Sequence, residues 1–346
     1  MVNGKKIGVD LGTANVLIYL KGRGVVIHEP SVVAVALKDN TIVAVGGEAR
    51  EMLGRTPGSI AVIRPMRDGV VADYLTTEAM LRYFLGRVVG RFNFIKPETV
   101  ICVPAGVTGV EQRAVREAAE AAGARRPARL LPEPLAAAIG ARIPVGSPRG
   151  HMVVDIGGGR SEAAVISMYA IVVSESLRVA GDRIDDTIAA YVKRRHNLII
   201  GERTAEEVKI AVANALVAEA DPKLSTAVRG RDQISGLPRT ITLSSPEVAQ
   251  AIQDPLMSIV GAIRSVLEKT PPELASDIID RGIVLTGGGS LLRNLDRLIA
   301  QEVSIPCHVA ENPLDCVAIG AGIALEHWEL MERSLPSEGE SLVATY

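Results

Sequence analysis

The chain has 346 residues, which is longer than a usual single domain, so two domains are expected. Hydrophobic residues make up 47% and charged residues 23%, a balance typical of globular proteins with a large core. The 38 Lys and Arg nearly balance the 40 Asp and Glu, which gives no electrostatic reason to expect a nucleic-acid partner. No apolar run reaches the ~18 residues needed to span a bilayer, so a cytoplasmic protein is expected.

The first 150 residues combine strand patterns with helix patterns. Apolar periodicity and turn signals predict strands at 6–11, 15–20, 24–28, 31–37, 41–45 and 99–104, and helices at 76–89, 110–122 and 134–141. Two prolines and two glycines at 144–150 indicate a connection between domains.

The second half repeats this plan. Strands are expected at 152–156, 163–167, 170–174, 177–179, 226–230 and 238–243, and helices at 185–195, 204–216 and 245–268. The polar tail at 336–346 is expected to be disordered. Hairpins followed by helices, twice, predict an α/β fold with mixed sheets.

One loop pattern occurs twice. Each copy is an apolar strand that ends in an Asp, a Gly-rich polar turn and a second apolar strand. The first copy contains Asp10, Gly12, Thr13, Ala14 and Asn15, and the second contains Asp155, Gly157, Gly158, Gly159, Arg160 and Ser161.

Glycine lets a backbone approach a ligand closely, so that its amide N–H groups point at phosphate oxygens. Asp10 and Asp155 suit Mg²⁺, which keeps most of its waters, so contact through water is expected. Each loop alone is better explained as an ordinary hairpin turn, because short glycine motifs often occur without a ligand. The ordered pair instead predicts two lobes that close on one nucleotide.

A third loop follows the apolar residues 283–285. It contains Gly287, Gly288, Gly289 and Ser290, and a helical pattern follows with Leu291, Leu292, Leu295, Leu298 and Ile299 on one face. A glycine turn that opens a helix presents free N–H groups and the positive end of the helix dipole. The loop therefore predicts the floor of the nucleotide site, and the alternative is a turn without a ligand.

Longer strings make the chain similar to the actin, sugar-kinase and heat-shock-chaperone ATPase superfamily, and within it to the MreB family of bacterial actin homologues. Besides the glycine loops these are HEPSVVAV at 28–35, MLGRTPG at 52–58, RPMRDGVVAD at 64–73, EPLAAAIG at 133–140, GERTAE at 201–206, PPELA at 271–275 and the segment 286–296. The resemblance covers nearly the whole chain, from Ile7 to about Glu332.

The resemblance implies an actin-like ATPase fold with two RNase-H-like lobes, each carrying a small inserted subdomain. Subdomain IA is expected at 1–32, 66–145 and 315–346, IB at 33–65, IIA at 146–182 and 243–314, and IIB at 183–242. The implied ligands are ATP and Mg²⁺. Glu206, Glu207 and Lys209 would lie beside the base and ribose, with Gly287–Ser290 on the opposite wall. Without the resemblance, Glu206 and Lys209 are better explained as a solvated charge pair.

Two catalytic residues are expected. Glu133 lies between Pro132 and Pro134 at the start of a helix, where its carboxylate can orient and deprotonate an attacking water. The alternative role is to complement the helix dipole. Arg160 stands where relatives usually have a Thr that positions this water. It could hold the γ-phosphate, displace the water, or swing outward and leave the role to Ser161, so ATP turnover is open.

The segment 91–97 combines aromatic and basic residues. Phe92, Phe94 and Ile95 with flanking basic residues fit a wedge that enters an anionic membrane surface, and the resemblance implies that Phe94 and Ile95 do so. The alternative is a loop packed on its own domain.

The resemblance implies a cytoskeletal protein with slow ATP hydrolysis. It would form double filaments of its own copies at the cytoplasmic face of the inner membrane and direct the cell-wall elongation machinery that maintains rod shape. The alternative is a sugar kinase or chaperone with the same ATPase core. The small insertions at about 33–65 and 183–242 disfavour it.

Overall fold

Two five-stranded sheets of identical topology form the framework, in a computed structural model that describes residues 4–90, 95–217 and 224–335. The first sheet has the order β10-β9-β1-β2-β3, with β1 Lys6–Leu11, β2 Asn15–Leu20, β3 Gly24–Pro30, β9 Glu98–Val103 and β10 Arg129–Pro132. The second has the order β18-β17-β11-β12-β13, with β11 His151–Ile156, β12 Ser161–Ser167, β13 Ala170–Leu177, β17 Ile283–Thr286 and β18 Cys307–Val309.

Each sheet starts with an antiparallel three-stranded meander and adds two strands parallel to its first strand. We call the first sheet with its surrounding elements lobe I and the second lobe II. The repeated loops are the first turn of each meander, between β1 and β2 and between β11 and β12. The sequence repeat thus corresponds to a repeat of the fold.

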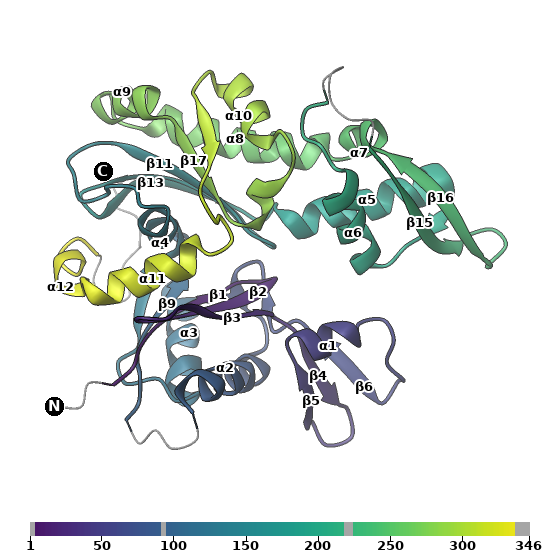
Figure 1. Cartoon of the computed structure of the whole chain (residues 1–346), viewed down its shortest axis with the longest axis horizontal. Coiled ribbons are helices and arrows are strands. Elements are labelled where there is room, and N and C mark those ends of the chain that lie inside the picture. The colour runs from purple at the N-terminus through teal and green to yellow at the C-terminus, as the bar shows by residue number, and fades with distance from the viewer. Residues whose placement is uncertain (1–3, 91–94, 218–223, 336–346) are drawn as a thin grey trace.

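Two small-residue helices lie between the sheets. They are α4, Glu133–Gly140, and α11, Cys316–Glu326 (Figure 1). Both pack on lobe I strands, and α4 also contacts β11 and β12 of lobe II. One buried cluster therefore includes residues of both sheets and both helices.

The remaining helices cover the outer faces of the sheets. In lobe I these are α2, Tyr74–Val89, and α3, Gly109–Ala121, while the short α12, Trp328–Met331, follows α11. In lobe II they are α8, Gln253–Lys269, α9, Pro272–Arg281, and α10, Leu295–Val303. Thr108 caps α3 with a reciprocal hydrogen-bond pair to Glu111, as its sequence position predicts.

Each lobe carries a small sheet at the same end of the molecule (Figure 1). In lobe I it consists of β4 Val33–Ala36, β5 Ile42–Val45 and β6 Ile60–Ile63, with α1 Gly47–Glu51; the two-stranded β7 Met66–Arg67 and β8 Val70–Val71 follow. In lobe II it consists of β14 Leu198–Ile199, β15 Ser225–Asp232 and β16 Pro238–Ser244, with α5 Gly181–His196, α6 Glu202–Val212 and α7 Ser245–Ala251.

The expected α/β fold with mixed sheets is confirmed, and three local predictions are wrong. The helix at 245–268 is broken at Ile252, because Pro255 lacks an N–H and is tolerated only in the first turn of a new helix, α8. The strands at 170–174 and 177–179 form one strand, β13, that pairs along its length with β12. The third glycine loop does not open α10. The exact subdomain boundaries stay a prediction, and the tail 336–346 lies outside the described residues.

Candidate functional site

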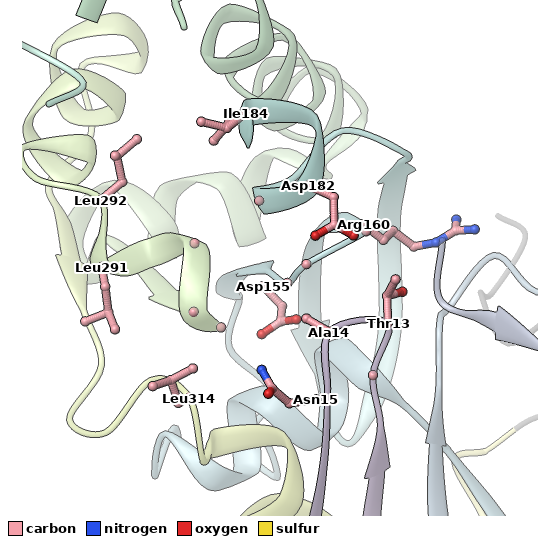
Figure 2. A pocket seen from close by; sticks show the side chains of 18 of the residues that line it. Thr13, Ala14, Asn15, Asp155, Arg160, Asp182, Ile184, Leu291, Leu292 and Leu314 are labelled. Atoms are coloured by element: carbon pink, nitrogen blue, oxygen red, sulfur yellow. The ribbon is translucent and has the colours of Figure 1, made fainter. Parts of the chain in front are cut away.

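A cavity of about 480 Å³ lies between the lobes, at the ends of β1, β11 and β17. Both repeated loops, the third glycine loop and helices α5 and α6 contribute to its wall. Figure 2 shows Ala14 and Asn15 on one side of this space and Leu291, Leu292 and Leu314 on the other. Every residue predicted to bind the cofactor lines the cavity except Glu207 and Ser290, and both predicted catalytic residues line it too.

The two repeated loops touch each other. A side chain at Gly158 would place its Cβ 2.7 Å from Ala14 Cβ, and one at Gly159 would reach within 2.8 Å of Thr13 Oγ1. Real Cβ atoms do not come so close, so only glycine permits this approach of the two backbones. The backbones of the two loops therefore lie next to each other and line the same cavity from both lobes.

Thr13 is buried and its hydroxyl is already bonded. Its Oγ1 accepts a hydrogen bond of 2.8 Å from the backbone N–H of Gly69, in the turn between β7 and β8. The first loop is therefore anchored to that turn through Thr13, which also lines the cavity.

An Asp follows the apolar core of each central strand and lines the cavity. Asp155 Oδ1 accepts a 2.7 Å hydrogen bond from Thr286 Oγ1 of β17. Burial raises the pKa of Asp155 to about 6, and burial together with the charge of Asp155 raises the pKa of Asp10 to about 8. These shifts indicate a site with excess buried negative charge, which a cation would relieve.

Glu133 is the first residue of α4 and also lines the cavity. Burial raises its pKa well above the usual value, and the charges of Glu162 and Asp10 raise it further. Glu162, on β12, is buried and accepts hydrogen bonds from Ala105 N at 3.1 Å and Ser176 Oγ at 2.6 Å. Burial raises the pKa of Glu162 to about 7. Two neighbouring acids thus disfavour each other's ionisation.

The Arg160 side chain runs away from Asp155 and out of the cavity centre (Figure 2). Its Nε donates to the carbonyl oxygen of Asp68 at 2.9 Å, and its Nη1 donates to Ser176 Oγ at 2.8 Å. Asp68 belongs to lobe I and Ser176 to lobe II, so the guanidinium joins the lobes beside the loops. The buried hydroxyl of Ser161 donates to Val179 O at 2.7 Å, so its proton is already used and does not point at a water in the cavity.

The third glycine loop forms a single 3₁₀ turn, η1, at Gly288–Leu291. The helix α10 starts only at Leu295, after Asn294 in a left-handed conformation, so no helix dipole points from the glycines into the cavity. Ser290 is buried and its hydroxyl donates to Gly287 O at 2.7 Å. The sequence predicts Leu291 on the same helix face as Leu295, and instead it precedes α10 and is 56% exposed in the apolar cavity wall.

Helix α6 brings two of its three predicted residues to the cavity. Glu206 and Lys209 line it, and Lys209 Nζ donates to Gly181 O at 3.1 Å and Asp185 Oδ2 at 2.7 Å. Glu207 instead pairs with Arg203 on the same helix, with Nε and Oε1 3.0 Å apart.

Residues 4–333 match the model of the family described as MreB/Mbl protein. The chain belongs to the MreB/Mbl family. It is similar to the cell shape-determining protein Mbl of Bacillus subtilis strain 168, with 52% identity over 329 residues that cover 95% of this chain and 98% of Mbl. The family is thus one of actin-like, cell shape-determining proteins.

Solved structures agree with this assignment. MreB5 of Spiroplasma citri bound to AMPPNP superposes with a TM-score of 0.90 and 37% identity, over 96% of this chain and 99% of that protein. The MamK double helical filament superposes with a TM-score of 0.76 and 20% identity, over 94% of this chain and 99% of MamK, and shows the shared fold alone.

A metal fits this MreB/Mbl site only with help from water or a ligand. Among the described residues, no three His, Cys, Asp or Glu side chains are placed to hold an ion. Asp10 and Asp155 nevertheless both line the cavity. Two carboxylates suit Mg²⁺, since this ion keeps several waters and takes phosphate oxygens as further ligands.

The expected membrane segment is described only in part. Phe92 and Phe94 lie outside the described residues, and Ile95 is 37% exposed. None of the helices in the described part of this MreB/Mbl chain is long and apolar enough to cross a membrane.

Sequence reasoning missed several polar residues around the site. Asp182 lines the cavity at the start of α5, and its backbone N–H donates to Gly158 O at 2.8 Å. A Gly-Asp pair before a helical pattern signals such a position, but the helix was expected to start later. Glu162 is a lone acid in an apolar strand, a pattern that signals a buried functional carboxylate.

Proposed function

We propose that this MreB/Mbl chain binds ATP with Mg²⁺ between its lobes and uses this binding to control assembly into filaments. One observation carries the proposal: two equivalent glycine loops from two equivalent lobes meet at a single cavity, and each is preceded by an Asp that lines this cavity. MreB5 of Spiroplasma citri, with the same fold, binds AMPPNP.

Different residues of the cavity wall bind the phosphates, the metal ion and the nucleoside. Backbone N–H groups of the loops at 12–15 and 157–160 receive the phosphates. Asp10 and Asp155 hold Mg²⁺ through water, and the ion supplies charge neutralisation for the phosphates. Glu206 and Lys209 lie beside the ribose and base, opposite the apolar wall that Leu291, Leu292 and Leu314 form.

Glu133 is the proposed catalytic base for slow ATP hydrolysis. It orients the attacking water and accepts its proton at the carboxylate. Burial and the neighbouring acids raise the pKa of the Glu133 carboxyl group, which makes its carboxylate a stronger base. Arg160 contributes by hydrogen bonds to both lobes beside the phosphate loops, and it does not displace the attacking water.

Filaments at the cytoplasmic face of the inner membrane are the proposed working form. The same fold forms a double helical filament in MamK, and head-to-tail contacts that do not close give open polymers. Phe92, Phe94 and Ile95 attach the filaments to lipid, where they direct the cell-wall elongation machinery and maintain cell shape. The relative named cell shape-determining protein Mbl supports this last step.

Electron microscopy of the purified protein on an anionic lipid monolayer tests the proposal. With ATP and Mg²⁺ we expect paired filaments on the lipid, and without nucleotide far fewer. The Phe94→Ser, Ile95→Ser double variant should form filaments in solution but leave the monolayer bare. Ile279→Ser, which changes an exposed apolar residue in α9, is the matched control and should bind lipid normally. Monomers under every condition would contradict assembly, and lipid binding by the double variant would contradict the attachment site.

A further inference from the structure

Two arginines of lobe I face three carboxylates of lobe II at the end where the small sheets lie. Arg50, on α1, pairs with Glu206 of α6. Arg64 follows β6 and contacts two acids, with Nη2 3.0 Å from Glu202 Oε2 and Nη1 3.8 Å from Asp182 Oδ2. Figure 1 shows α1 and α6 opposite each other across this end of the molecule.

The opposite side of the cavity is closed by tight helix packing. A side chain at Gly140 of α4 would place its Cβ 1.8 Å from Cys316 O, and one at Gly320 of α11 would come equally close to Ala136 O. Such close backbones fix α4 on lobe I, and α4 also contacts β11 and β12 of lobe II within one buried cluster. The lobes can therefore move apart most easily at the end that the arginines bridge.

Two of the three acids also line the cavity. Glu206 and Asp182 each face the cavity and reach an arginine of the other lobe, whereas Glu202 and both arginines are not part of the cavity wall. Pairing with Arg50 or Arg64 thus fixes the position of an acid at the rim and at the same time holds the lobes closed.

The exposure of these side chains makes the contact weak and reversible. The arginine side chains are 44% and 38% exposed and that of Glu202 is 62% exposed, so solvent and salt screen the pairs. Several weak pairs that break together suit a device that must open and close.

We propose that Arg50 and Arg64 form an interlobe latch that positions Glu206 and Asp182 and retards the release of bound nucleotide. Opening the lobes requires the latch pairs to separate, so the latch slows the exit of a ligand more than its entry. The effect on release rests on the proposed nucleotide site. The effect on the lobes does not.

The Arg64–Glu202 pair allows a clean test, because neither side chain lines the cavity. Release of mant-ATP from the full chain, chased with excess ATP in a stopped-flow instrument, should be about twofold to fivefold faster in Arg64→Glu and in Glu202→Arg. The double variant restores the pair in reverse and should bring the rate back toward the wild-type value, but not fully, because a Glu at position 64 cannot pair with Asp182. Raising the KCl concentration should speed release from the wild type. Arg113→Glu breaks a pair within α3 and should leave the rate unchanged.

A second measurement reports on the lobes without nucleotide. Spin labels attached through p-azidophenylalanine at Lys38 and Ser235 lie in the hairpins of the two small sheets. Pulsed electron paramagnetic resonance should give longer distances in the Arg50→Glu, Arg64→Glu variant than in the wild type. An unchanged distance distribution, or single variants that release mant-ATP at the wild-type rate, would overturn the latch. A wild type that binds no mant-ATP would overturn the proposed function, and the distances would still decide on the latch.

Discussion

Arg160 illustrates how one residue at the loops can act on both lobes. Its position in the second glycine loop is evident from the sequence, and so is the departure from the usual Thr. The direction of its side chain is not, because the two acceptors, Asp68 O and Ser176 Oγ, are 92 and 16 residues away in the chain. The folded contacts place the guanidinium outside the cavity centre, and the role of Arg160 in turnover stays a prediction.

Replacing Arg160 by Thr should speed phosphate release without preventing assembly. Both hydrogen bonds of the guanidinium are lost, and each is worth ~1 kcal/mol, so an increase of up to about thirtyfold is expected. A phosphate-sensor fluorescence assay during polymerisation measures the rate, and pelleting measures assembly. Arg149→Thr, which changes an exposed arginine outside the cavity, is the control. Equal release from wild type and Arg160→Thr would dismiss the role of Arg160.

At the scale of elements, the sequence predicted where most strands and helices lie but not how closely two of them pack. Apolar periodicity placed β1, β2, β9, β11, α2 and α3 within a few residues. The break at Ile252 and the 3₁₀ turn after Gly287 depend on Pro255 and on the packing of Gly287 and Gly289 against Ile156, which periodicity does not report. The contact between α4 and α11 depends on Gly140 and Gly320, because a Cβ at either position would overlap the backbone of the other helix. The sequence alone does not show that these two helices pack against each other.

Gly320→Ala should strongly destabilise the protein. The new Cβ would overlap Ala136 O on α4, and overpacking of this kind costs about 1–3 kcal/mol. Chemical denaturation monitored by circular dichroism measures the loss. Gly261→Ala in α8 is the matched control, because a Cβ there has no neighbour within 4 Å and alanine favours a helix. Equal midpoints for the wild type and Gly320→Ala would show that the two helices do not pack closely.

For the whole molecule, the repeated loop predicted two lobes around a shared site, and the two sheets of identical topology confirm the duplication. The site residues in the loops were within reach of the sequence because the same pattern of an Asp and glycines follows two separate strands. The residues that join the lobes were not. The partners that Arg50, Arg64, Glu162 and Asp182 have in the other lobe come from distant parts of the chain, and no local sequence pattern reports such pairings.

Isothermal titration calorimetry of the full chain with ATP and Mg²⁺ tests the central claim most directly, namely that the two loops bind one nucleotide between the lobes. The wild type should bind one nucleotide per chain with measurable heat. Gly158→Ala should lose this binding, because its Cβ would meet Ala14, while Gly201→Ala has no such neighbour and should bind normally. Absence of heat with the folded wild-type protein, or full binding by Gly158→Ala, would contradict the account.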